Sequence, residues 1–213
     1  MREGKARLDW RFHILLQFAE IRLRELKRFY DEATTHFKRD FKRLQEEFTE
    51  QNTEDSEEMV DYFVDRRDEL ESLLDLKQEF GIIGLYTMLE RFLRLVLGHL
   101  RDAGEPIPAE TKPWYMDTLK DKFMLVNVKV TQPPFAWTKI KKLQAIRKCI
   151  AHEEGWVDKE RAKILRTYGL KVKGNEFLKL PDGYFLEAWN LVKDTCRQVI
   201  KECQKKPTKA ERV

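Results

Sequence analysis

The chain has 213 residues, of which 37% are charged, and its formal net charge is +4 because 41 Lys and Arg residues face 37 Asp and Glu residues. It contains only 9 glycines and 7 prolines, a composition that favours long helices and argues against a β-sandwich or barrel. No apolar run is long enough for a membrane span, and the first residues lack the apolar core of a signal peptide. The three cysteines show no metal-ligand spacing and fit a reducing compartment. We therefore expect a cytoplasmic protein without membrane contact, metal or cofactor.

The first part of the chain, residues 1–78, predicts a helical hairpin that resembles a coiled coil. Residues 6–49 indicate one long helix, because apolar side chains recur at steps of three and four: Leu26, Tyr30, Ala33, Phe37, Phe41, Leu44 and Phe48. The polar segment QNTEDSEE interrupts this pattern and supplies N-cap residues for a second helix. We expect that second helix to end near Lys77.

Residues 79–205 predict a helical bundle with a small β-hairpin. The segment FGIIGLYTMLERFLRLVLGHL is apolar on most faces, which indicates a central helix, and Gly and Pro residues follow it. A short helical or irregular segment leads to a helix over residues 139–152. A Gly-Asn turn within residues 170–178 predicts a β-hairpin, and a final helix follows over residues 185–203. The fold class is therefore all-α, and residues 206–213 are expected to form a disordered tail.

One window of the sequence lacks acidic residues. Between Lys122 and His152 there is no Asp or Glu, whereas several lysines and one arginine lie inside the window. This distribution indicates a local positive surface of the kind that binds phosphate backbones. The candidate RNA-binding residues are Lys129, Lys139, Lys141 and Lys142. The alternative is that these lysines only solvate a helix and a loop.

Two Arg–His pairs share a spacing of five residues. Arg94 and His99 lie among bulky aliphatic residues, which favours a structural role at the rim of a bundle. Arg147 and His152 lie at the end of the acid-free window, just before the sequence EEG, where a helix is expected to end. Five residues correspond to about 140° around a helix, so the two side chains meet only if both border one groove or if the helix loosens near His152.

The chemistry of this second pair suits RNA. Imidazole exchanges protons near neutral pH, and a guanidinium group can hold phosphate oxygens in a bidentate fork. In RNA the 2′-OH already lies beside the phosphorus atom, so a proton-transfer group and a cation can promote its attack without a metal ion.

The motif LQAIRKCIAHEEG, together with the upstream helix LYTMLERFLRLVL, resembles the HEPN superfamily, in particular its RiboL-PSP-like and abortive-infection-like members. The resemblance covers roughly residues 80–205 and leaves the N-terminal hairpin as an addition. It implies a helical bundle with an Arg-x4–6-His motif and a homodimer whose two motifs form one composite site. Many members are metal-independent endoribonucleases of antiviral defence and toxin–antitoxin systems.

The resemblance assigns roles to individual residues. Arg147 becomes the phosphate-contacting or charge-stabilising residue, His152 the proton-transfer residue, and Glu90 an auxiliary partner. The residue after the motif arginine is usually Asn, Asp or His in active members, but here it is Lys148. This lysine contacts phosphate, alters the protonation of the histidine, or marks a member that binds RNA without cutting it.

These observations lead to three hypotheses. The first is a HEPN-type endoribonuclease that dimerises through its bundle and cleaves RNA by attack of the 2′-OH. The second is a non-catalytic HEPN-like module that binds RNA, a nucleotide or a partner protein. The third is a coiled-coil interaction protein whose N-terminal hairpin binds a protein partner through Phe37, Phe41, Leu44 and Phe48.

Overall fold

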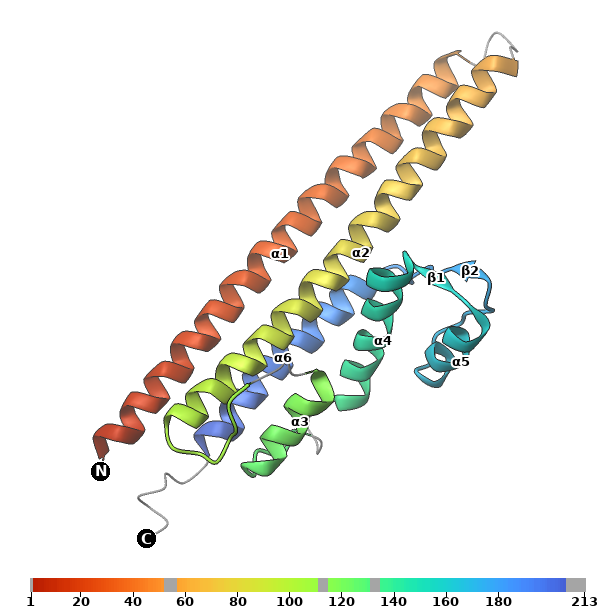
Figure 1. Ribbon diagram of the computed structural model, residues 1–213. Helices are drawn as coiled ribbons and strands as arrows, with labels where there is room; N and C mark the ends of the chain where they lie inside the picture. Colours follow the sequence, from red (N-terminus) through yellow and green to blue (C-terminus); the bar gives the residue numbers. More distant parts are fainter. Residues whose placement is uncertain (1, 52–56, 111–114, 131–134, 206–213) are drawn as a thin grey trace.

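The computed structural model describes residues 2–51, 57–110, 115–130 and 135–205, and within them the chain forms six α-helices and one two-stranded antiparallel sheet. This confirms the predicted all-α class with a small β element (Figure 1). The elements in chain order are α1 (Arg2–Gln51), α2 (Glu57–Asp102), α3 (Met116–Leu125), α4 (Trp137–Glu153), β1 (Trp156–Val157), α5 (Lys159–Thr167), β2 (Glu176–Phe177) and α6 (Tyr184–Gln204).

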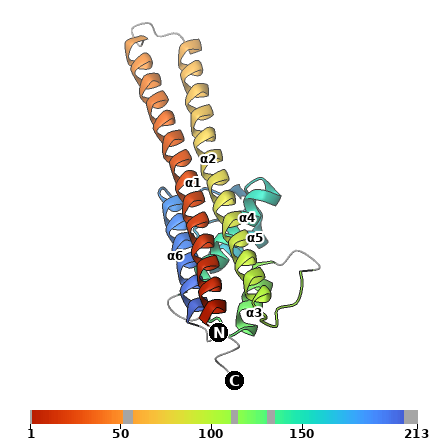
Figure 2. The ribbon, with the colours of Figure 1, turned by 90° about the vertical axis from the view of Figure 1, so that its left-hand side faces the viewer.

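Helices α1 and α2 run antiparallel along each other and form a long hairpin, half of which projects beyond the other elements (Figures 1 and 2). The apolar stripe predicted on α1 is half-buried in the projecting half, where each helix has only the other to pack against. Near the far end, the rings of Phe48 and Phe63 meet edge to face with centroids 4.9 Å apart. The hairpin is therefore held by a narrow apolar seam with charged residues on both outer faces.

Helix α2 does not end near Lys77 as the sequence analysis expected, but continues without a break to Asp102. Two of its three glycines lie where other helices approach closely: Gly81 faces Phe185 of α6, and Gly84 faces Leu26 of α1. The change from polar to apolar composition near residue 79 marks a change of surroundings. It is the point at which α2 leaves the two-helix hairpin and enters the bundle.

The core of the bundle surrounds the second half of α2, against which α1, α6, α4 and α3 all pack. Side chains from the beginning of α1 belong to the same apolar cluster: Phe12, Leu15, Ala19 and Leu23. The boundary expected between residues 78 and 79 thus falls inside a continuous helix, and residues on both sides of it contribute to one core.

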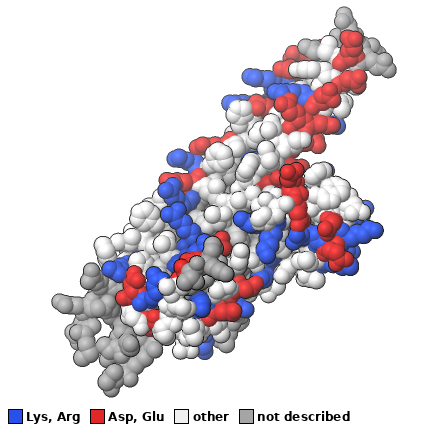
Figure 3. Space-filling model, viewed as in Figure 1, with Lys and Arg blue, Asp and Glu red and all other residues white. Residues whose placement is uncertain are grey.

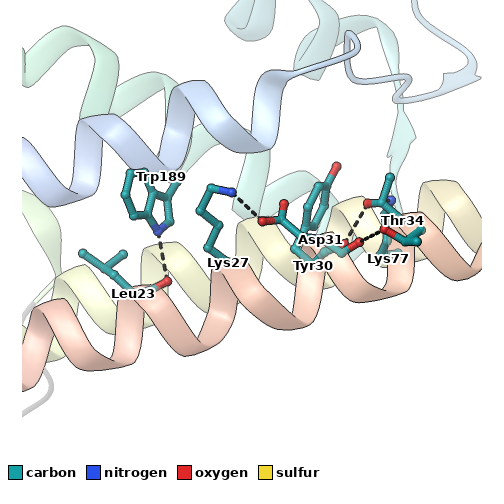
Figure 4. A network of polar contacts seen from close by, with 8 residues as sticks. Leu23, Lys27, Tyr30, Asp31, Thr34, Lys77 and Trp189 are labelled. Carbon is teal, nitrogen blue, oxygen red and sulfur yellow. Dashed lines mark hydrogen bonds and ion pairs between the residues drawn. The ribbon is translucent and has the colours of Figure 1, made fainter.

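Polar side chains connect the helices where the hairpin meets the bundle (Figure 4). The indole Nε1 of Trp189 on α6 donates a hydrogen bond to the backbone oxygen of Leu23 on α1, with a distance of 3.0 Å. The Nζ of Lys77 on α2 donates to Thr34 Oγ1 at 2.7 Å and lies 4.3 Å from the centre of the Tyr30 ring. These contacts fix the mutual register of α1, α2 and α6.

The small sheet differs from the predicted hairpin in its first strand. Trp156 and Val157 of β1 pair with Phe177 and Glu176 of β2, whereas residues 170–172 form no strand. The physical reason is that Leu170 and Val172 are buried in the core, so they anchor the loop between α5 and β2. Helix α5, which the sequence analysis missed, lies between the two strands and begins where the Asp158 side chain accepts a hydrogen bond from the Arg161 backbone N–H.

The segment expected to be a disordered tail, residues 206–213, lies outside the described residues. Within the parts of the chain that the structure describes, none of the helices has a stretch long and apolar enough to cross a membrane.

Candidate functional site

Arg147 and His152 lie on the last two turns of α4 and contact each other directly. The Arg147 Nη1 and His152 Nε2 atoms are 3.0 Å apart. Because a guanidinium group can only donate, this Nε2 accepts, which requires a neutral imidazole with its proton on Nδ1. Helix α4 is still intact at His152, so the contact does not depend on a loosened helix. The long arginine side chain instead reaches around the last turn.

The end of α4 leaves His152 open to solvent. Glu154 and Gly155 adopt left-handed conformations with φ of 50° and 79°, and both of their backbone N–H groups turn back to the carbonyl of Cys149. This is a usual way to end a helix, and it turns the chain toward β1. His152 is consequently exposed in the final turn, while Arg147 is partly buried.

Tyr86 of α2 supports the arginine, a role that the sequence analysis did not assign. The Arg147 guanidinium lies 5.7 Å from the centre of the Tyr86 ring, within the range of a cation–π contact. The Tyr86 side chain is only 4% exposed, and its hydroxyl forms a hydrogen bond with the buried side chain of Gln144. Burial is the main cause that raises the pKa of Tyr86 above its ordinary value, followed by the Glu90 carboxylate, so the hydroxyl remains protonated at neutral pH. One feature of the sequence could have indicated a buried polar partner for α4. Gln144 is a polar residue within the apolar stripe of that helix, so its side chain needs a hydrogen-bond partner in the core.

Glu90, predicted as an auxiliary residue, lies near this site but has another ionic partner. Its Oε1 atom is 3.2 Å from Arg94 Nη2, and Arg94 also lies 3.4 Å from Glu110. Arg94 therefore pairs with two carboxylates, although its spacing to His99 is the same as that of the other pair. Burial is the main cause that lowers the pKa of His99, followed by the charge of Arg11.

Lys148 is exposed on the same side of α4 as His152, as expected from residues four apart. Lys141, seven residues earlier, falls on this face too. The Lys141 Nζ, however, is 2.7 Å from the Asp117 carboxylate of α3. Lys148 is therefore the predicted lysine that both lies on the face of His152 and reaches solvent.

The remaining predicted lysines do not gather around the Arg–His pair. Lys142 lies 5.2 Å from the centre of the Tyr184 ring, and Lys129 is exposed in the segment after α3. Lys139, at the opposite end of α4 from His152, lines a groove of about 370 Å³ together with Glu187 and Asp194 of α6. The window that lacks acidic residues in the sequence thus has acidic neighbours in space, and both signs of charge mix over this part of the surface (Figure 3).

Side-chain contacts with α5 and β1 hold the end of α4 in place. The Arg161 guanidinium pairs with the Glu153 carboxylate through two contacts, of which the one from Nε measures 3.0 Å. The Cys149 thiol donates to the backbone oxygen of Trp156 at 3.4 Å. These contacts fix the turn after His152 relative to α5 and the sheet.

Among the described residues, no group of three or more His, Cys, Asp or Glu side chains lies close enough to hold a metal ion. The three cysteines are all buried as free thiols. No protein-family model matches the chain, and comparisons with curated proteins and with solved structures gave no significant match. The resemblance to the HEPN superfamily therefore rests on the motif residues alone.

Proposed function

We propose that the protein is a metal-independent endoribonuclease of HEPN type, in which Arg147 and His152 act on the RNA backbone. The observation that carries this proposal is the 3.0 Å contact between the two side chains at an exposed helix end. A base and a permanent cation within reach of one phosphate are the groups that attack by the 2′-OH requires. Defence against foreign RNA or a toxin–antitoxin role in the cytoplasm belongs to the same proposal.

In the proposed reaction, a phosphate oxygen takes the place of the imidazole as the partner of Arg147. The His152 Nε2 lone pair is then released and accepts the proton of the 2′-OH as the new bond to phosphorus forms. The bond from phosphorus to the 5′ oxygen breaks, and the leaving oxygen takes up a proton. The products are a 2′,3′-cyclic phosphate and a 5′-hydroxyl end. Arg147 stabilises the charge that builds up on the phosphorane, with Tyr86 holding its guanidinium in place.

A second copy of the chain would supply the acid for the leaving group. In the arrangement implied by the resemblance, two motifs meet across a twofold axis, so one His152 acts as base and the other as acid. Adding an excess of the His152→Ala protein to the wild type tests this point. A composite site loses activity as mixed dimers form, because each mixed dimer contains only one His152, whereas a site contained in one chain keeps the activity of the wild-type chain.

The proposed activity is tested by incubating the purified chain with a mixed RNA pool in EDTA. The Arg147→Ala and His152→Ala variants are expected to lose about 100-fold or more in rate, the usual scale for a proton-transfer or charge-stabilising group. His36→Ala is the matched control, because His36 is exposed on the distant half of α1. Equal degradation by the wild type and His152→Ala would refute the proposal.

The alternative function is a module that binds RNA without cutting it, and the exposed Lys148 on the face of His152 favours it. The expected result is tight binding that weakens with salt, with no cleavage. Lys148→Ala would then reduce the slope of log affinity against log salt by about one, as for the loss of one phosphate contact.

A further inference from the structure

The outer face of α1 carries an exposed apolar stripe. Trp10, Phe18 and Phe29 are 63%, 63% and 64% exposed, and Ile21 is 42% exposed. With about 100° per residue, these four side chains fall within an arc of about 100°, which the charged side chains of Glu25 and Arg28 share. The opposite face of the same segment is the one that enters the core. In Figure 2, α1 runs in front of the other helices, and none of the described elements covers this outer face.

The positions of the stripe are symmetric along the helix. Phe18 and Ile21 are equally far from a point between residues 19 and 20, and so are Trp10 and Phe29. An antiparallel second α1, related by a twofold axis at that point, brings Phe18 level with Ile21 and Trp10 level with Phe29. Such self-complementarity is the requirement for an isologous interface. We propose that two copies of the chain associate through this stripe, with their α1 helices antiparallel.

The area is sufficient for a specific contact. Aromatic side chains present about 150–250 Å² each, so their exposed fractions together with that of Ile21 give about 450 Å² of apolar surface per copy. The two copies then bury about 900 Å² of apolar surface before the flanking polar side chains are counted. This brings the interface to the size of about 1,000 Å² or more that biological contacts reach. A stripe of this extent is comparable to the largest apolar patch on a typical monomer, a patch that is often functional.

The proposed interface is independent of the proposed function. Arg147 and His152 lie on α4, which packs against α2 and lies away from α1 (Figure 1). Association through α1 therefore leaves both Arg–His pairs uncovered. It also differs from any twofold contact that would join two α4 helices. An experiment that disproves the α1 interface therefore leaves the proposed function standing, and the reverse also holds.

The first test is the mass of the full chain in solution, measured by light scattering or sedimentation over a range of concentrations. The wild type is expected to associate through α1, as a dimer or as a larger assembly where the α4 contact of the proposed function also forms. Phe18→Glu is expected to weaken the α1 contact at least about 100-fold, because each contact contains two such residues near the twofold axis. Phe177→Glu is the matched control, since Phe177 is also 63% exposed but lies on β2. A monomeric wild type overturns the proposal, as does a dimer that both variants affect equally. Circular dichroism verifies that each variant is folded.

The second test measures the direction of the helices by distances between spin labels. The native cysteines are buried, so labels attach at introduced surface positions. With a rise of 1.5 Å per residue, labels on Arg22→Cys lie about 8 Å apart along the axis, and labels on Thr35→Cys about 47 Å apart. A parallel pair gives similar distances at both positions. Similar distances, or no measurable coupling at Arg22→Cys in a dimeric sample, would overturn the antiparallel arrangement.

Discussion

Replacing Gly81 by alanine tests the junction at which α2 enters the bundle. A Cβ atom at this position would lie 2.7 Å from Phe185 Cδ2 and 3.3 Å from Tyr30 Cδ2. The two rings are stacked with centroids 3.7 Å apart, and Phe185 is only 1% exposed, so the ring has little room to move away. Overpacking of this kind costs about 1–3 kcal/mol.

The helix propensity of alanine offsets part of that cost, by about 0.5–1 kcal/mol. We therefore expect Gly81→Ala to lower the free energy of unfolding by about 1–2 kcal/mol, measured by urea denaturation followed by far-UV circular dichroism. Gly98→Ala is the control in the same helix, because no heavy atom lies within 4 Å of its added Cβ. It should stabilise the protein by about 0.5–1 kcal/mol. If Gly81→Ala is as stable as Gly98→Ala, the close packing of α2 against Phe185 is wrong.

Three further predictions concern contacts described above. Trp189→Phe removes the hydrogen bond to the Leu23 carbonyl and should lower the free energy of unfolding by about 0.5–1.5 kcal/mol in the same urea assay. Asp158→Ala removes the N-cap of α5 and should cost about 1 kcal/mol, seen as faster amide exchange in α5, whereas Asp158→Asn keeps the cap. Burial, and secondarily Asp75, raises the pKa of Glu79 above 4.5, so folding favours its protonated form. The protonated Glu79 side chain therefore stabilises the fold below its ordinary pKa, and this stabilisation is lost as the pH rises through the raised pKa of the folded state. Glu79→Gln should consequently be more stable than the wild type at neutral pH and equally stable in acid.

Each of these predictions has a result that would contradict it. An unchanged stability of Trp189→Phe would mean that the indole contributes only its packing. Equal exchange in α5 for the alanine and asparagine variants would remove the capping role of Asp158. A stability difference between Glu79→Gln and wild type that does not depend on pH would show that burial of the charge is not its cause.

Much of the fold follows from local patterns in the sequence. The long α1, the closing helix α6 and the all-α class were predicted because one apolar stripe at helical spacing is enough to specify each. The end of α2 was placed wrongly. The sequence changes from polar to apolar near residue 79 because the helix enters the bundle there, and this change was taken for the end of the helix. The first strand was misassigned because Trp156 pairs with Phe177 across the intervening α5, and no local pattern specifies such a contact.

In the candidate site, too, local sequence patterns predicted some features, whereas others depend on contacts between residues far apart in the chain. The sequence identified Arg147 and His152 but gave no reason for them to touch, because their angular separation on the helix suggested otherwise. Their contact depends on the reach of the arginine side chain, and its support depends on Tyr86, some sixty residues earlier in the chain. The acid-free window was a property of the sequence alone, since α3 and α6 bring Asp117, Glu187 and Asp194 to its lysines.

The most direct test of the proposed activity compares one RNA oligonucleotide with its all-deoxy counterpart in EDTA, for wild type and His152→Ala. The proposed reaction predicts that the wild type cuts only the RNA and leaves a 2′,3′-cyclic phosphate, and that His152→Ala is slower by about 100-fold or more. Cleavage of the deoxy oligonucleotide, or equal rates for the two proteins, would contradict the role assigned to the Arg147–His152 pair.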